Sequence, residues 1–111
     1  MQLILLKHFA KQLKSFQKKH FSLKESLIFA LENFSPTQAS SLGQKLYKIR
    51  LVPKGMARGK SGAFRVIVLF LQEDGFLIPI IVYAKSQSSN LSQKEINGHL
   101  QECLGELRDL H

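Results

Sequence analysis

Apolar side chains recur every three or four residues in the first third of the chain, which is the period of a helix with one buried face. Phe9, Leu13 and Phe16 form the first repeat, and lysines occupy positions between them. The second repeat is formed by Leu23, Leu27, Leu31 and Phe34. The pattern predicts two consecutive amphipathic helices, of which the first has a basic outer face.

Local signals mark both ends of the second helix. Ser22 and Glu25 have the spacing of a capping box, in which each side chain would satisfy a free backbone N–H at the helix start. The helix should end at Ser35-Pro36, because proline and the residue before it disfavour helical backbone. The two helices are therefore predicted to form a hairpin that covers the elements after them.

The apolar period then changes to two. Residues 46–52 consist mainly of strand formers, and Lys48 and Arg50 share one face of that strand because side chains alternate. Residues 64–71 and 76–84 are nearly continuous apolar runs, which predict two strands covered on both faces.

Asp74-Gly75 lies between these two runs and predicts a hairpin turn. Pro79 cannot donate to a strand ladder, so it predicts an irregularity in the second strand.

The two ends of the chain complete the predicted fold. Leu3 to Leu6 is interpreted as a short opening strand, and the run is too brief for a signal peptide. Ser92 and Glu95 form a second capping box ahead of an apolar stripe that predicts a last helix. The expected order is β-α-α-β-β-β-α over one domain, residues 1–111. This is an α+β fold with two N-terminal helices on a small, twisted, mainly antiparallel sheet, plus a C-terminal helix.

The charge of the chain indicates what kind of partner it binds. The formal net charge is +8, which favours an anionic partner such as nucleic acid, an acidic protein or an anionic membrane surface. Residues 43–72 contain no acid and seven bases, namely Lys45, Lys48, Arg50, Lys54, Arg58, Lys60 and Arg65. A solvated basic hairpin would explain this run, but a bound polyanion would also relieve the mutual repulsion.

Three of these bases are candidates for chemistry. Lys48 and Arg50 can converge on one phosphate from a shared strand face. Arg65 lies in an apolar run, and the nearest acids in sequence, Glu73 and Asp74, lie at the far end of its strand. A phosphate-facing role for Arg65 is therefore favoured over a buried ion pair.

The sequence gives little support for a metal site or a reactive cysteine. The four histidines are dispersed and have no metal-ligand spacing with the single cysteine, Cys103, so no metal and no cofactor are expected. Cys103 lies on the apolar stripe of the last helix and is interpreted as a core residue. One cysteine cannot form an internal disulfide, which suits a reducing compartment.

The basic strands and the segments around them resemble the RelE/HigB toxin superfamily, with the HigB-like branch most similar. The resemblance rests on Tyr-Lys-Ile-Arg-Leu at 47–51, Gly-Lys-Ser-Gly-Ala-Phe-Arg-Val-Ile at 59–67, Tyr-Ala-Lys-Ser-Gln at 83–87, and Leu-Ser at 91–92. It implies a RelE-like microbial RNase fold and a toxin of a type II toxin-antitoxin system that cleaves messenger RNA, often in the ribosomal decoding site.

The resemblance also implies partners and site residues. The partners would be a cognate antitoxin, messenger RNA and the ribosome in the cytoplasm, with operator DNA bound only through the antitoxin complex and no membrane. Lys48, Arg50 and Arg65 match the family's catalytic positions. The candidate RNA-binding residues are Lys54, Arg58, Lys60, Tyr83 and Lys85.

The chain departs from the family pattern at the general base. Several relatives carry a tyrosine, histidine or acid beyond the last strand, and after Tyr83 this sequence has no tyrosine, nor a histidine or acid between Ala84 and Asn90. The hypothesis is metal-independent attack by the RNA 2′-hydroxyl. Arg50 and Arg65 would stabilise the phosphorane, and Lys48 would serve as base because nearby positive charges disfavour its protonated form.

Two alternatives remain open from the sequence. One is a protein inhibitor on the same scaffold, like the ParE relatives that poison DNA gyrase. The other is a nucleic-acid-binding module without catalysis, which would show salt-dependent binding alone.

Overall fold

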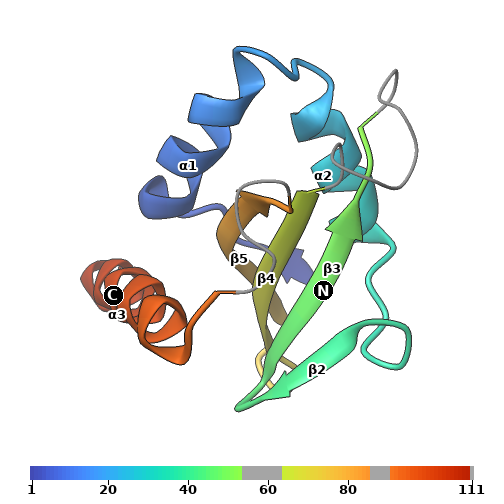
Figure 1. Ribbon diagram of the computed structural model, residues 1–111. Coiled ribbons are helices and arrows are strands. Elements are labelled where there is room, and N and C mark those ends of the chain that lie inside the picture. The colour runs from blue at the N-terminus through green and yellow to red at the C-terminus, as the bar shows by residue number, and fades with distance from the viewer. Residues whose placement is uncertain (54–63, 86–90, 111) are drawn as a thin grey trace.

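The computed structural model describes residues 1–53, 64–85 and 91–110 (Figure 1). Its elements in chain order are β1 (Gln2–Leu3), α1 (Lys7–Gln17), α2 (Leu23–Glu32), β2 (Ser40–Gly43), β3 (Leu46–Leu51), β4 (Phe64–Leu71), β5 (Phe76–Ala84) and α3 (Gln93–Asp109). The α+β class and the element order agree with the prediction, except that strand β2 is additional.

The strands form one mixed sheet in the order β1-β5-β4-β3-β2. β1 runs parallel to β5, and the other pairs are antiparallel. The predicted irregularity at Pro79 is confirmed, because the β4–β5 register shifts between Ile67, opposite Ile81, and Val68, opposite Pro79. The predicted turn ends at Gly75, whose φ of 71° is a conformation that favours glycine.

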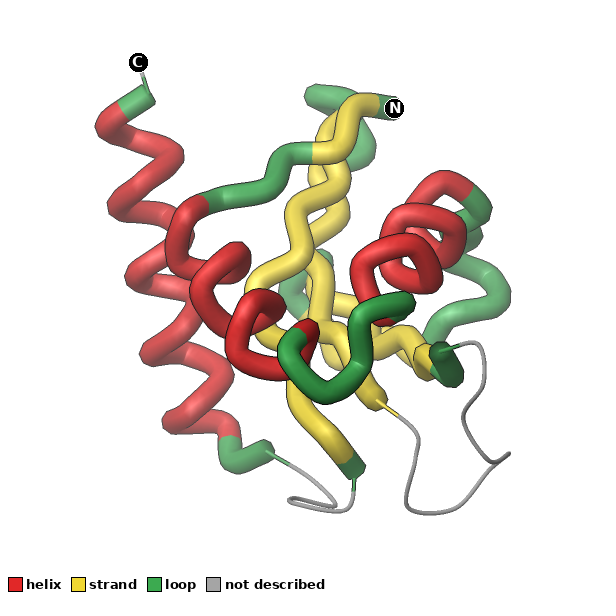
Figure 2. The backbone as a smooth tube through the Cα atoms, turned by 90° about the horizontal axis from the view of Figure 1, so that it is seen from above, coloured by secondary structure: helices red, strands yellow, loops and turns green. Residues whose placement is uncertain are grey.

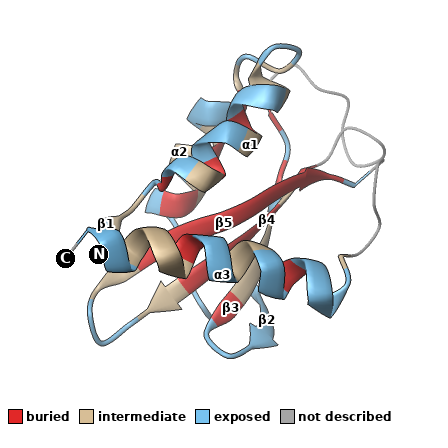
Figure 3. Cartoon of the chain, turned by 90° about the vertical axis from the view of Figure 1, so that its left-hand side faces the viewer, coloured by how far each residue is buried: buried red, intermediate tan, exposed pale blue. Residues whose placement is uncertain are grey.

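Helices cover both faces of the sheet (Figures 2 and 3). On one face, the apolar stripes of α1 and α2 pack against a buried cluster that includes Phe64 and Val66 of β4. On the other face, Ile96 and Cys103 of α3 pack with a second buried cluster that includes Ile67. The central strands are therefore apolar on both sides, as the nearly continuous hydrophobic runs predicted.

The sequence pattern missed β2 because this strand has no apolar face. All four of its residues are exposed, and it exists through pairing with β3, in which Ser40 lies opposite Lys48. Gln44 and Lys45 connect the two strands with positive φ angles of 53° and 68°. Glycine or asparagine usually occupies such turn positions, so the usual sequence signal of a hairpin is absent.

Only one of the two predicted capping boxes forms. Ser92 accepts from the backbone N–H of Glu95, whose side chain accepts in return. The box at Ser22 is wrong: Ser22 is the N-cap residue of α2 but makes no side-chain cap hydrogen bond. Its φ of −85° and ψ of 0° belong to a turn that runs directly into the helix, rather than to the extended backbone that a capping box needs.

A residue distant in sequence caps α1. The Oε2 atom of Glu106 in α3 accepts from the backbone N–H of Lys7 at 2.8 Å, and its Oε1 atom accepts from that of His8 at 2.6 Å. The carboxylate therefore satisfies two free N–H groups at the positive end of the α1 dipole. This contact attaches the C-terminal helix to the first helix.

Gln12 of α1 bonds to the part of the β5 edge that has no strand neighbour. Its side-chain amide donates to the carbonyl of Ile80 at 2.9 Å, and its carbonyl oxygen accepts from the N–H of Val82 at 3.1 Å. Parallel pairing with β1 reaches only Leu77. The glutamine side chain thus replaces a strand neighbour beyond that point and satisfies buried backbone groups.

A histidine pair forms a second contact between α1 and α3. The Nε2 atom of His8 and the Nδ1 atom of His99 lie 2.8 Å apart, within hydrogen-bond distance. One ring must donate and the other accept, so the bond requires at least one neutral ring. Burial lowers the pKa of His99, His8 lowers it further, and Glu95 and Glu102 oppose this shift.

The histidine pair should make stability depend on pH. The folded-state pKa of His99 lies below its ordinary value, so the unfolded chain binds protons more readily than the folded chain. The contribution to stability is complete above about pH 6.5 and is lost as pH falls through the folded-state pKa. We expect His99→Gln and His8→Gln to flatten the pH dependence of the free energy of unfolding below neutral pH, measured by urea denaturation. Wild-type slopes in both variants would contradict this role.

Candidate active site

Two strand registers bring Arg50, Arg65 and Tyr83 into one row across the sheet. Arg50 of β3 lies directly opposite Arg65 of β4, and Arg65 lies directly opposite Tyr83 of β5. Residues opposite each other in antiparallel strands share a face, with their Cβ atoms about 4.5–5.5 Å apart. Their face is the one that α3 covers, since Tyr83 belongs to the same buried cluster as Ile96.

The two arginines are adjacent like charges, an arrangement that is unfavourable without an anion. Arg65 is half-buried, and its Nη1 atom donates to the carbonyl of Phe64 at 3.3 Å. In the described part of the chain, no acidic side chain forms an ion pair with Arg65. The phosphate-facing role of Arg65 stays a prediction, and it would use the remaining guanidinium donors.

Tyr83 adds a neutral donor to the row. Its side chain is buried, and burial raises the pKa of the phenol, while the charge of Arg65 acts in the opposite direction. The hydroxyl therefore stays protonated at neutral pH. In that form it can donate a hydrogen bond to a phosphate oxygen, but it cannot serve as the general base.

Lys48 lies on the same face, one row away from the arginines. It is half-buried and opposite Ile67 of β4. Two residues along a strand span roughly 6.6 Å, which is within the reach of a lysine side chain from the Arg50–Arg65 pair. The prediction that Lys48 and Arg50 share a face is confirmed.

The candidate RNA-binding residues are only partly described. Lys85 is exposed immediately after β5. Lys54, Arg58 and Lys60 lie outside the described residues. Of the predicted site, the structure thus brings together Lys48, Arg50, Arg65 and Tyr83.

Metal-binding groups and membrane spans were also considered for the described residues. No three His, Cys, Asp or Glu side chains among them could hold a metal ion. Burial raises the pKa of the Cys103 thiol to about 11, so the sulfur is protonated and fits the predicted core role. None of the helices in the described ranges has the length and apolarity of a membrane span.

The row could therefore support chemistry on a phosphate. Two guanidinium groups and a phenol that share one face of neighbouring strands would stabilise negative charge as it develops on phosphoryl oxygens. The alternation of side chains along a strand predicted that Lys48 and Arg50 share a face. The sequence did not indicate that Arg65 lies directly opposite both Arg50 and Tyr83. That arrangement depends on the registers of two separate strand pairs.

Comparison with protein families gives a match over nearly the whole chain. A family model described as the RelE toxin of the RelE/RelB toxin-antitoxin system matches residues 4–108. A mutant of the E. coli toxin RelE in the free state is a similar solved structure, with 18% identity, a TM-score of 0.48, and coverage of 78% of this chain and 85% of that chain. No curated protein matches the sequence.

Proposed function

The chain belongs to the RelE family of toxins of toxin-antitoxin systems, and on this premise we propose that it is an endoribonuclease that cleaves messenger RNA. The cleavage would take place in the ribosomal decoding site in the cytoplasm, with residues 1–111 acting as one toxin domain. The assignment to the HigB-like branch stays a prediction from the resemblance.

One observation carries the proposal: Arg50, Arg65 and Tyr83 lie in one row, with two cations directly opposite each other. A phosphodiester that crosses this row would receive hydrogen bonds from both guanidinium groups and from the phenol. These donors would stabilise the pentavalent phosphorane more than the starting phosphate, because its oxygens carry more charge.

The proposed reaction is an intramolecular transesterification without a metal. Lys48 accepts the proton of the RNA 2′-hydroxyl, the 2′-oxygen bonds to phosphorus, and the bond to the 5′-oxygen breaks. The departing 5′-oxygen takes up a proton from water, so the products are a 2′,3′-cyclic phosphate and a 5′-hydroxyl, and Lys48 later returns its proton to water. Arg50 and Arg65 stabilise the phosphorane. The RNA is held by Tyr83, Lys85, Lys54, Arg58 and Lys60.

The proposed partners follow from the toxin family. A cognate antitoxin keeps the toxin inactive, and messenger RNA on the ribosome is the substrate. Operator DNA would be bound only by the toxin-antitoxin complex.

Induction of the chain in a bacterium, with messenger RNA 5′ ends mapped before and shortly afterwards, tests the proposal. We expect growth arrest and new 5′ ends inside translated frames, which the Arg65→Ala chain should not produce. Growth arrest with intact messenger RNA and a DNA damage response would instead indicate a gyrase inhibitor. Salt-dependent nucleic-acid binding without arrest or cuts would indicate a binding module.

A further inference from the structure

A small polar pocket, which we call the edge pocket, lies at the outer edge of β3. Residues of segment 33–40, which follows α2 and includes the first residue of β2, form one wall, and Lys48, Ile49 and Arg50 of β3 form the other. Its volume is about 340 Å³, within the range typical of pockets for small ligands. Lys48 and Arg50 also belong to the candidate active site, so the pocket and the site are continuous.

The backbone of Arg50 faces this outer edge. The N–H of Phe70 donates to the carbonyl of Lys45 at 2.9 Å, so these two residues are a hydrogen-bonded pair of the β3–β4 ladder. Bonded and non-bonded pairs alternate along antiparallel strands, and the register from β3 to β4 is regular, so Arg50 and Arg65 are a non-bonded pair. The N–H and C=O of Arg50 therefore point away from β4.

No strand neighbour pairs with these two backbone groups. β2 begins at Ser40, opposite Lys48, and does not reach Arg50. Among the described residues, no other backbone group bonds to the N–H or C=O of Arg50. At the opposite edge of the sheet, the Gln12 amide bonds to the corresponding free groups of β5. The edge of β3 thus offers an adjacent donor and acceptor to a ligand.

The wall from segment 33–40 adds an amide and an aromatic ring. Gln38 is exposed, and in the described part of the chain its side chain forms no hydrogen bond. The ring of Phe34 is fixed by edge-on contacts with Tyr47 and Phe70, with centroid distances of 5.6 and 5.2 Å. Hydrogen-bonding groups beside an aromatic ring are the combination that proteins use to bind an unstacked RNA base.

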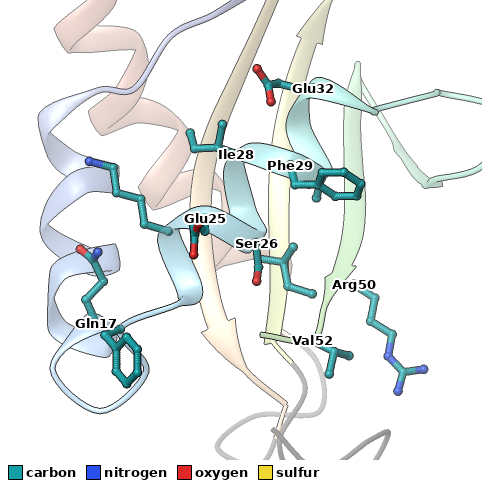
Figure 4. A pocket seen from close by; sticks show the side chains of 12 residues that line it. Gln17, Glu25, Ser26, Ile28, Phe29, Glu32, Arg50 and Val52 are labelled. Carbon is teal, nitrogen blue, oxygen red and sulfur yellow. The ribbon is translucent and has the colours of Figure 1, made fainter. Parts of the chain in front are cut away.

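The charge of the edge pocket has one sign. Of the described residues that line it, Lys48 and Arg50 are charged, and none is acidic. Figure 4 shows the neighbouring pocket along α2, where the Arg50 side chain points outward past the edge of β3 and Glu25 and Glu32 lie away from its guanidinium group. The positive charge of the edge pocket therefore favours a ligand that is part of a polyanion.

We propose that the edge pocket binds one nucleobase of the RNA and sets the base preference of cleavage. This inference rests on the proposed function. Neighbouring strands lie about 4.8 Å apart, so the base of a nucleotide whose phosphate lies at the Arg50–Arg65–Tyr83 row can reach the pocket. The Arg50 backbone and the Gln38 amide bond to the donors and acceptors on the edge of the base, and Phe34 contacts its ring.

The first test measures binding without cleavage. The probes are four trinucleotides of a single base each, 2′-O-methylated so that no 2′-hydroxyl can attack. Their dissociation constants are measured by NMR titration for the wild-type chain, Gln38→Ala and Gln101→Ala. Gln101 is the matched control because it is also an exposed glutamine but lies on α3, outside the edge pocket.

We expect the wild-type chain and Gln101→Ala to bind one trinucleotide at least roughly fivefold more tightly than the others, the lower end for a good pair of hydrogen bonds to a base. Gln38→Ala should lose most of this preference. The favoured trinucleotide should also slow hydrogen exchange of the Arg50 backbone N–H in the wild-type chain. Equal binding of all four probes, no binding of any, or a preference that Gln38→Ala leaves unchanged would overturn the proposal.

The second test maps messenger RNA 5′ ends after induction of the same variants and of Gln38→Glu. Gln38→Ala should broaden the base distribution at one position beside the cuts, while Gln101→Ala keeps the wild-type distribution. Gln38→Glu accepts hydrogen bonds but cannot donate them, so its cuts should shift toward bases that present amino groups. A wild-type distribution in both Gln38 variants would refute the inference.

The two tests separate this inference from the proposed function. The trinucleotides cannot be cut, so their binding reports on the edge pocket whether or not the chain is a ribonuclease. Absence of cuts by the wild-type chain would contradict the proposed function, and the trinucleotide preference would still decide whether the pocket binds a base.

Discussion

Replacement of Arg65 by alanine is expected to slow messenger RNA cleavage by roughly 10²–10³-fold, the loss typical of removing one fixed donor to a developing oxyanion. Arg65 occupies the centre of the row, opposite Arg50 on one side and Tyr83 on the other. The alanine variant lacks the guanidinium group that lies between Arg50 and Tyr83. The rate is measured on a translating ribosome in single-turnover conditions, where product release does not limit it.

Two further variants distinguish a specific role of Arg65 in the reaction from a general effect of positive charge. Arg65→Lys keeps the charge but loses the planar fork of donors, so it should recover only part of the rate. Arg108→Ala removes an exposed arginine near the end of α3 and should cleave like wild type. Thermal unfolding of all three variants shows whether the fold is intact. A wild-type rate in folded Arg65→Ala would disprove the assignment.

Phe64→Ala is expected to lower the free energy of unfolding by about 3–5 kcal/mol, the range for a large aromatic removed from a core. Phe64 is only 2% exposed. The rings of Phe16 and His20 contact it edge-on, each with centroids 5.1 Å from its own. It therefore attaches the helical hairpin to the strand that carries Arg65, and its loss leaves a cavity under that hairpin, on the sheet face opposite the active-site row.

Phe21→Ala is the matched control for this result. Phe21 is the same residue type but 89% exposed, so its replacement should change the free energy of unfolding by less than about 0.5 kcal/mol. Urea denaturation of both variants gives the comparison. A similar small change for both would show that the packing of Phe64 contributes little to the fold.

Local patterns were sufficient to predict most elements. The helical repeats that include Phe9 and Leu27 became α1 and α2 because one face of each is buried against the sheet. The apolar runs on either side of Gly75 became the two central strands. The class of the fold was predictable for the same reason, since periodicity is a property of neighbouring residues.

Contacts between distant residues were not predictable in this way. Glu106 caps α1 from 98 and 99 residues away in the chain, and Gln12 bonds to a strand 68 and 70 residues away. Neither side chain differs from an ordinary surface residue in its local sequence. The β2 strand was missed because only pairing with β3 defines it.

For the site, the sequence by itself determined the excess of positive charge and the shared face of Lys48 and Arg50, because alternation in a strand is local. It also placed Arg65 in a buried strand without a nearby acid. Only the tertiary structure decided that Arg50, Arg65 and Tyr83 lie side by side, because the registers of two strand pairs set that alignment. The exposure of Phe21 and Phe29 was also visible only in the tertiary structure, because it depends on which surfaces the rest of the chain covers.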